Sequence, residues 1–221
     1  MLSKFFKGVL GGGKPAGAEE KTPFLAHYES RFAPLLGGRA SGFRVIFELL
    51  EARCQGRAEP ALIVETGSMR TPGNWSGDGQ STVLWKEFAA IYESEIHTVD
   101  LDPEAARVVR EECGDAVSAH TGDSVDFLYG LAGVAHPRQI DLLYLDSYDF
   151  DLKDPFPSAF HHIKELIAVR PCLGQGSIVA IDDNFVLAEG GFTGKGYLAM
   201  QWFEHLRIPC LHQGHQFVWQ L

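Results

Sequence analysis

The segment from residue 61 to residue 82, ALIVETGSMRTPGNWSGDGQST, constrains the fold more than any other part of the chain. A short apolar run, Ala61 to Val64, ends at the acidic Glu65, and Gly67 and three further glycines follow before a helix is predicted from Gln80. A buried parallel strand that opens into a glycine-rich turn is how α/β proteins hold a nucleotide-like ligand. The segment lacks the GxGxxG pattern of dinucleotide sites and the GxxxxGK[ST] pattern of phosphate loops. This pattern therefore points away from NAD and ATP and towards another cofactor with an adenosyl group.

Composition narrows the classes of partner. The chain has 221 residues, which suits one domain. Its formal net charge of -10 argues against nucleic acid as the main partner, because phosphate binding requires clustered lysine and arginine. The four cysteines lie far apart without a CxxC pattern, so we expect reduced thiols in a cytoplasmic protein. No apolar run approaches the roughly 20 residues of a spanning helix, and we expect no stable membrane insertion.

The order of predicted elements indicates a tail followed by an α/β domain. A linker-like GGGKPAGAEEK run predicts a flexible N-terminal tail over 1–22. Helical spacing of apolar residues predicts helices over 24–36 and 41–53, within an N-terminal region, 23–58, that packs on the core or forms a lid. The remainder, 59–221, alternates short apolar strands with longer amphipathic stretches and is the predicted cofactor-binding domain.

Strands and helices are predicted in turn through this last region. The strands fall at 61–65, 96–100, 116–120, 140–145 and 177–182, and the helices at 80–92, 103–112, 124–132 and 157–169. Such alternation implies right-handed crossovers and a mostly parallel sheet with helices on both faces. A helix near 196–206 then leads to two strand-like runs around Gln213 and Gly214, which predicts an antiparallel hairpin at the end of the sheet.

Five short motifs lie at the predicted strand tips. They are VETG after the first strand, HTVDLDP at the second, AHTGDS after the third, DLLYLDSYD at the fourth and VAIDDN at the fifth. In this order and spacing, the chain from about Ala61 to Leu221 resembles the class I S-adenosylmethionine-dependent methyltransferases, and its last two motifs resemble those of the metal-dependent, catechol-type O-methyltransferase branch. The resemblance implies an α/β, Rossmann-like, seven-stranded, mostly parallel sheet with a C-terminal antiparallel hairpin strand, and S-adenosylmethionine as the cofactor.

The resemblance and the strand-end positions together suggest the residues that bind the cofactor. Asp100 ends the second strand, where a carboxylate can accept both ribose hydroxyls; it could also cap a helix, although Asp102 before Pro103 fits a cap better. Asp123 either contacts the adenine or caps the next helix, and Ser81 either binds the cofactor's carboxylate at a helix N-terminus or is a cap. The expected set is Glu65, Gly67, Gly79, Ser81, Asp100, Asp123 and Asp146.

A second group of oxygen ligands is expected at the same edge of the sheet. Asp146, Asp183 and Asn184 follow two strands that deliver them to one carboxyl edge, and carboxylate and amide oxygens suit Mg²⁺ or another divalent cation. The resemblance implies that these three residues bind the metal, with Asp182 as the neighbouring alternative. The alternative is that they are solvated strand-end and capping residues. A metal bound to an acceptor hydroxyl would lower its pKa and fix its orientation.

The general base is the position where the resemblance fails. The catechol-type branch has a lysine three residues beyond the aspartate of the fourth strand, and this chain has Asp149 there. His161 and His162 at the start of the following helix, or Lys153 in the preceding loop, could take the proton instead. Lys195 in the glycine-rich GGFTGKGY loop is a further candidate.

The sequence therefore predicts a methyltransferase that O-methylates a small-molecule hydroxyl with help from a divalent metal. A metal-independent methyltransferase is one alternative, and a non-catalytic nucleotide-binding module of the same fold is another. The negative charge speaks against a nucleic-acid substrate, and the N-terminal helices are compatible with a homo-oligomer.

Overall fold

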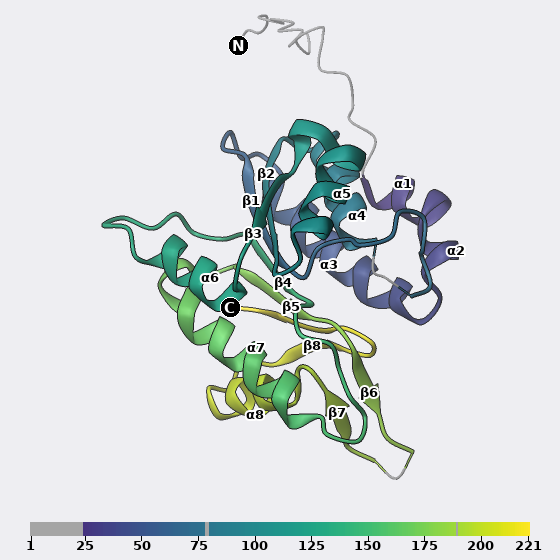
Figure 1. Cartoon of the computed structure of the whole chain (residues 1–221), viewed down its shortest axis with the longest axis vertical. Coiled ribbons are helices and arrows are strands. Elements are labelled where there is room, and N and C mark those ends of the chain that lie inside the picture. The colour runs from purple at the N-terminus through teal and green to yellow at the C-terminus, as the bar shows by residue number, and fades with distance from the viewer. Residues whose placement is uncertain (1–23, 78–79, 189) are drawn as a thin grey trace, which may run out of the picture.

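The main sheet has seven strands and is mostly parallel, as the sequence predicts (Figure 1). The computed structural model describes residues 24–77, 80–188 and 190–221, so the predicted tail over 1–22 lies outside the described residues. The strand order is β3-β2-β1-β4-β5-β9-β8; β9 pairs antiparallel with both β5 and β8. The strands are β1 (Ala61–Thr66), β2 (Ser94–Asp100), β3 (Ser118–Thr121), β4 (Leu142–Leu145), β5 (Ile178–Ile181), β8 (Cys210–Gln213) and β9 (Phe217–Gln220).

Helices cover both faces of the sheet (Figure 1). One face carries α1 (Phe24–Arg31), α3 (Ala40–Cys54), α4 (Ser81–Ala89) and α5 (Pro103–Cys113); the other carries α6 (Ser124–Ala132), α7 (Phe156–Val169) and α8 (Tyr197–His205). Successive side chains of β4 point to opposite faces, so Leu142 and Tyr144 join one core cluster and Leu143 and Leu145 the other. Burial on both faces explains why the central strands read as continuous apolar runs.

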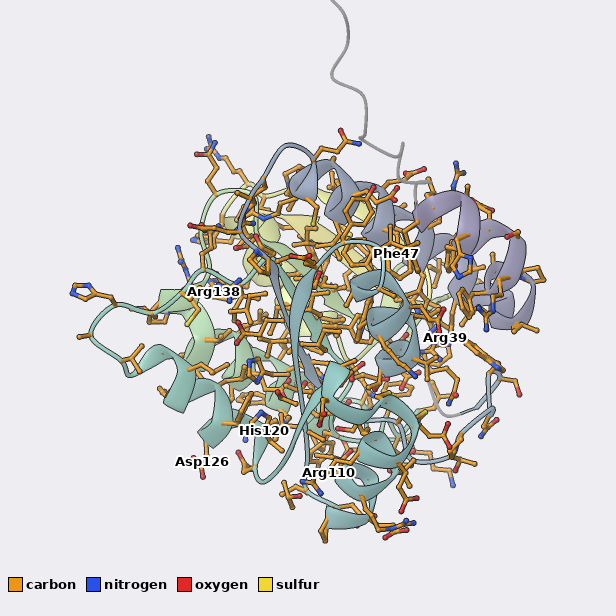
Figure 2. The ribbon with its side chains drawn as sticks, turned by 90° about the horizontal axis from the view of Figure 1, so that it is seen from above. Arg39, Phe47, Arg110, His120, Asp126 and Arg138 are labelled. Atoms are coloured by element: carbon orange, nitrogen blue, oxygen red, sulfur yellow. The ribbon has the colours of Figure 1, made fainter. Side chains whose placement is uncertain are left out.

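The N-terminal helices contribute aromatic side chains to the first core cluster. Phe43 and Phe47 pack against Trp85 of α4, with ring centroids of Phe47 and Trp85 5.5 Å apart, and Phe24 packs against Phe47. Figure 2 labels Phe47 in this crowded part of the molecule. The helix expected over 24–36 is divided: α1 ends at Arg31, α2 covers Ala33–Leu36, and a 3₁₀ turn covers Gly37–Arg39. Pro34 lacks a backbone N–H, so it suits the first turn of a new helix better than the interior of a long one.

Two aspartates act as helix caps. The Asp102 carboxylate accepts a hydrogen bond from Glu104 N and opens α5, where Pro103 takes the first helical position. The Asp123 carboxylate accepts from Val125 N and Asp126 N and opens α6. Capping does not remove Asp123 from the site, because it also lines the cavity described below.

A small hairpin that the sequence does not predict follows β5. Its strands are β6 (Asn184–Val186) and β7 (Phe192–Gly194), paired antiparallel and separate from the main sheet (Figure 1). The hairpin places Lys195 next to the carboxyl end of β5, where Lys195 N donates to Asp183 O at 3.2 Å. Within the described ranges, none of the helices has the length and apolar character that crossing a bilayer would require.

Candidate functional site

A cavity of about 320 Å³ lies at the carboxyl ends of the parallel strands. Its walls come from the loops that follow β1 to β5, together with Arg39 from the N-terminal segment and Lys195 and His215 from the C-terminal part. Parallel strands of an α/β sheet bring their carboxyl ends to one edge, which is where such folds bind ligands. The cavity has a β1–β3 end around Gly67, Asp100 and Asp123, and a β4–β5 end around Asp146 and Asp183.

Asp100 connects the loop after β1 to the end of β2. Its Oδ2 accepts from Ser68 N at 3.0 Å, and its Oδ1 accepts from Asp102 N at 2.9 Å. The carboxylate lines the cavity, and each of its oxygens retains acceptor capacity for a ligand hydroxyl. The position predicted for ribose binding is therefore at the cavity wall, although ribose binding itself stays a prediction.

Gly67 permits a close approach between the ends of β1 and β4. Its φ is +83°, and a Cβ built there would lie 2.5 Å from the carbonyl oxygen of Asp146. Only glycine avoids both the left-handed strain and this contact. Gly67 N donates to Val99 O at 2.9 Å, so the turn is also bonded to β2.

Glu65 is held inside the fold. Its carboxylate is fully buried and accepts hydrogen bonds from Thr82 Oγ1 at 2.6 Å, Thr98 Oγ1 at 2.7 Å and Trp85 Nε1 at 2.8 Å. Burial raises the pKa of Glu65, and the hydroxyl and indole donors oppose that rise. The cavity lining, taken over the described residues, includes neither Glu65 nor the buried Ser81.

The donors to Glu65 come from α4 and β2, and Ser81 at the start of α4 also hydrogen-bonds Glu65, which indicates that both residues fix α4 against β1 and β2. Direct contact of Glu65 or Ser81 with the cofactor stays a prediction of the sequence. Gly79, the remaining glycine of the predicted set, lies outside the described residues. In the same loop Trp75 packs against Phe32, with ring centroids 5.6 Å apart, which ties the loop to the N-terminal segment.

A lysine ammonium lies between the two carboxylates that the sequence predicts as metal ligands. Lys195 Nζ is 2.7 Å from Asp146 Oδ1 and 2.9 Å from Asp183 Oδ2, and it donates to Asp146 O at 3.1 Å. The Lys195 side chain is only 3% exposed. Desolvation lowers the pKa of Lys195, but Asp146 and Asp183 outweigh it and raise that pKa overall, which keeps the amine charged.

The groups around Asp146 shift its pKa in opposite directions. Burial raises the pKa of its carboxyl group to about 7, with Asp182 and Asp183 acting in the same direction and Lys195 against it. The 2.7 Å contact with the Lys195 ammonium is the geometry of an ion pair, and the raised pKa of Lys195 agrees with it. Asp146 is therefore the ionised partner of Lys195.

The Asp182 carboxylate is held by several donors. It is buried, pairs with Arg39, and accepts from Tyr144 OH at 2.6 Å and Gln216 Nε2 at 3.0 Å. Although burial alone would raise the pKa of Asp182, Arg39 and then His215 hold it well below its usual range. Figure 2 labels Arg39 in the view from above.

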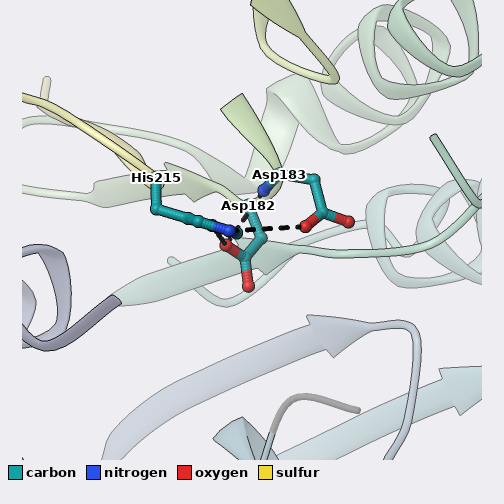
Figure 3. A group of neighbouring side chains, drawn as sticks. All are labelled: Asp182, Asp183 and His215. Carbon is teal, nitrogen blue, oxygen red and sulfur yellow. Dashed lines mark hydrogen bonds and ion pairs between the residues drawn. The ribbon is translucent and has the colours of Figure 1, made fainter. Parts of the chain in front are cut away.

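His215 is oriented by Asp182. Its Nδ1 lies 2.9 Å from Asp182 Oδ1, and its Nε2 lies 4.0 Å from Asp183 Oδ1 (Figure 3). The hydrogen bond to Asp182 raises the pKa of His215, although partial burial opposes the rise. His215 lines the cavity, and when its Nδ1–H donates to the ionised Asp182, Nε2 of the neutral ring carries the lone pair.

The arrangement does not fit a divalent cation. Asn184, the third predicted ligand, accepts from Gly196 N at 2.7 Å and donates to Ile181 O at 2.7 Å, so its amide holds the β6–β7 hairpin. Asp182, Asp183 and His215 have ligand atoms within 4.8 Å of one another, but the Asp182 carboxylate is already paired with Arg39. Lys195 lies between Asp146 and Asp183, so the carboxylates that a metal would need already carry two permanent cations, Lys195 and Arg39.

The histidines predicted as bases occupy different environments. His161 lines the cavity and lies 2.9 Å from Ser124 Oγ and 3.4 Å from Glu165 Oε1. His162 is fully buried on α7, its Nδ1 2.7 Å from Ser158 O, and burial lowers its pKa to about 4. Neither contact set includes Asp146 or Asp183.

The two predicted candidates in the loop after β4 are both exposed. Asp149 lines the cavity, 3.6 Å from Arg70 Nη1. Lys153 is not part of the cavity wall in the described chain. The role of each as a base stays a prediction.

Arg39 and His215 are among the site residues that the sequence does not predict, and it indicates Lys195 only as a further candidate base. Lys195 carried a sequence signal, since it is a lone cation in a glycine-rich loop. His215 adjoins Gly214 in the turn of the terminal hairpin, and Arg39 follows a glycine pair. The sequence offered no means of placing these two near the strand ends, because both come from distant parts of the chain.

Comparisons with known proteins extend these findings. A family model described as a methyltransferase domain matches residues 76–184, just under half of the chain. No curated protein matches the sequence significantly.

Two solved structures illustrate the similarity in fold. The MycE methyltransferase from the mycinamycin biosynthetic pathway, solved with Mg, SAH and mycinamycin VI, is 15% identical with a TM-score of 0.57, over 91% of this chain and 55% of that one. CalS11, a TDP-rhamnose 3'-O-methyltransferase, is 18% identical with a TM-score of 0.52, over 90% of this chain and 88% of that one. This chain thus spans about half the length of MycE, and at these identities the likeness establishes the fold.

Proposed function

We propose that this chain, for which the family match and the fold support a class I S-adenosylmethionine-dependent methyltransferase, transfers a methyl group from S-adenosylmethionine to a hydroxyl group of a small molecule. The observation that carries the proposal is one cavity with two chemically different ends. Gly67, Asp100 and Asp123 line the β1–β3 end, and Asp146, Asp183 and His215 line the β4–β5 end.

The β1–β3 end suits the nucleoside part of the cofactor. Asp100 presents carboxylate oxygens to the ribose hydroxyls, and the close turn at Gly67 leaves room for the ligand beside the backbone. Asp123 and Ser124 at the start of α6 line the same end, which supports assigning the adenine to it. S-adenosylmethionine supplies an activated methyl group when bound, so the chain's task is to align the acceptor with it.

The β4–β5 end suits an acceptor hydroxyl. In the proposed reaction the acceptor oxygen forms a bond to the methyl carbon, the carbon–sulfur bond breaks, and its electron pair stays on sulfur. The hydroxyl proton passes to His215 Nε2, whose ring is oriented by Asp182 at 2.9 Å from Nδ1. CalS11, which shares the fold, is itself an O-methyltransferase and so acts on a hydroxyl group.

The metal-independent alternative is the one that we favour. MycE was solved with Mg, but in this chain Lys195 lies between the two predicted ligands Asp146 and Asp183, and Asn184 is committed to the hairpin. The proposed reaction therefore has no step at a metal.

Titration calorimetry with S-adenosylmethionine tests this function directly. We expect the wild-type chain to bind S-adenosylmethionine and not NAD. The Asp100→Asn variant should bind it at least tenfold more weakly, a loss of about 1.4 kcal/mol, because the ribose loses a charged acceptor. Asp126→Asn is the matched control, since Asp126 is an exposed residue on α6 (labelled in Figure 2) that is not part of the cavity wall.

Two results would contradict the proposal. One is no binding of S-adenosylmethionine by the wild-type chain. The other is equal weakening by the Asp100→Asn and Asp126→Asn variants, which would remove Asp100 from the cofactor site.

A further inference from the structure

Lys195 is delivered to the strand ends by a hairpin that only glycines allow. Gly194 has a φ of +132°, and a Cβ there would lie 2.4 Å from Asp183 O; a Cβ at Gly196 would lie 2.8 Å from Asn184 Oδ1. The two glycines that flank Lys195 thus let the hairpin press against the end of β5. Asn184 closes the arrangement by accepting from Gly196 N at 2.7 Å.

The ammonium of Lys195 is fully coordinated by oxygen. Its three protons match three acceptors, Asp146 Oδ1 at 2.7 Å, Asp183 Oδ2 at 2.9 Å and Asp146 O at 3.1 Å. Two carboxylates and a carbonyl are the oxygen types that hard divalent cations also prefer. The position is therefore a cation site built from the ends of β4 and β5, and its occupant is covalently part of the chain.

The charges of the surrounding groups agree with a built-in occupant. Asp146, Asp182 and Asp183 bring three negative charges, while Arg39 neutralises Asp182 and Lys195 is shared by the other two. Removing the Lys195 charge would leave Asp146 and Asp183 facing one another with no cation between them. Two neighbouring carboxylates without compensation attract an external cation or take up a proton.

We propose that the Lys195 ammonium permanently fills the position between Asp146 and Asp183 that a divalent cation would take, so that this site works without a metal ion. The proposal deepens the proposed function and rests on it for its meaning in methyl transfer. Lys195 supplies one positive charge at the β4–β5 end of the cavity, where an acceptor oxygen gains negative charge as its proton leaves. It also holds Asp146 and Asp183 in place as a positioning residue.

Binding of Mn²⁺ alone, followed by electron paramagnetic resonance, tests the proposal. We expect the wild-type chain to show no Mn²⁺ site below millimolar concentration. Lys195→Met, which keeps an unbranched side chain one atom shorter and without its charge, should gain one site that is at least tenfold tighter, and adding Asp183→Asn should abolish that site. Lys164→Met on the exposed surface of α7 is the matched control and should behave as the wild type does.

Two results would overturn the proposal. A wild-type Mn²⁺ site that is lost in Asp146→Asn or Asp183→Asn would mean that a metal displaces Lys195. Failure of both the wild type and Lys195→Met to bind Mn²⁺ would mean that the position is no cation site. Lys195→Gln serves the same comparison if Lys195→Met does not fold, as judged by circular dichroism, and the wild-type measurement decides independently of either variant.

Calorimetry with S-adenosylmethionine on the same samples separates this proposal from the proposed function. One result would separate them: the wild type binds neither Mn²⁺ nor S-adenosylmethionine, while Lys195→Met gains a Mn²⁺ site. That result would support Lys195 as the built-in cation and contradict the methyltransferase function.

Discussion

The backbone geometry of the site depends on the absence of a side chain at Gly67. Replacing it with alanine forces a left-handed φ on a residue with a Cβ and places that Cβ 2.5 Å from Asp146 O. Left-handed strain costs about 1–2 kcal/mol, and overpacking against backbone adds about 1–3 kcal/mol. We expect Gly67→Ala to lower the free energy of unfolding by about 2–5 kcal/mol in urea denaturation.

Gly56→Ala isolates the strain from the contact. Gly56 has a comparable φ of +71°, and a Cβ there would meet nothing within 4 Å. We expect this control to lose about 1–2 kcal/mol. Equal losses in the two variants would show that the approach of β1 to β4 at Gly67 is not tight.

The position of an acid at a strand end could be predicted from the sequence, but the direction of its side chain could not. The acids at the strand ends could be located from the apolar runs before them, and Asp100, Asp146 and Asp183 all line the cavity. Glu65 follows the same rule but is buried away from it. A strand buried on both faces gives no alternation from which the direction of one side chain could be read.

On α7, His162 couples folding to pH. Burial lowers its pKa in the folded chain to about 4 from an unfolded value near 6.5. The unfolded chain therefore binds a proton between these values while the folded chain does not, so this contribution is complete above pH 6.5 and decreases as pH falls to 4. Across that window we expect His162 to remove roughly 3 kcal/mol of stability.

The His162→Leu variant checks this assignment by urea unfolding at several pH values. Leucine cannot take up a proton, so the variant should lose stability less steeply than the wild type between about pH 6.5 and 4.5. His136→Leu, which replaces an exposed histidine, should retain the wild-type dependence. Glu165 lies 3.9 Å from His162, and its pKa is lowered to about 2, in part by His162, so its own titration falls below the pH window of this comparison. Parallel curves for wild type and His162→Leu would contradict the assignment.

At the scale of elements, amphipathic helices and strands with continuous apolar runs were predictable, and the small irregular hairpin was not. The strand and helix order of the main sheet follows from apolar runs and capping residues such as Asp102. The β6–β7 hairpin has two strands of three residues each, and one of them ends in glycine. Such strands carry no measurable period, and it is this hairpin that brings Lys195 to the site. The site could therefore be predicted only in the part that the buried apolar strands of the main sheet position.

At the scale of the whole molecule, the N-terminal helices share one core with the sheet. The Phe47 ring lies 4.6 Å from the Phe24 ring and 5.5 Å from the Trp85 ring, and all three side chains are fully buried. This packing favours a region that folds with the core over a separate lid. That the N-terminal helices fold together with the core stays a prediction, which an unfolding experiment can test.

Phe47→Ala is the variant that decides it. Loss of a buried phenylalanine should cost about 3–5 kcal/mol, whereas Phe160→Ala, at a side chain 60% exposed, should change stability by less than about 0.5 kcal/mol. If α1 and α3 fold with the sheet, far-ultraviolet circular dichroism and tryptophan fluorescence will report one coincident transition for both variants. Trp85 and Trp219 lie in the core clusters on opposite faces, so the fluorescence samples both. A loss of helix signal that precedes the fluorescence change would instead identify the N-terminal helices as a separately unfolding lid, because their packing would then not be needed to hold either core.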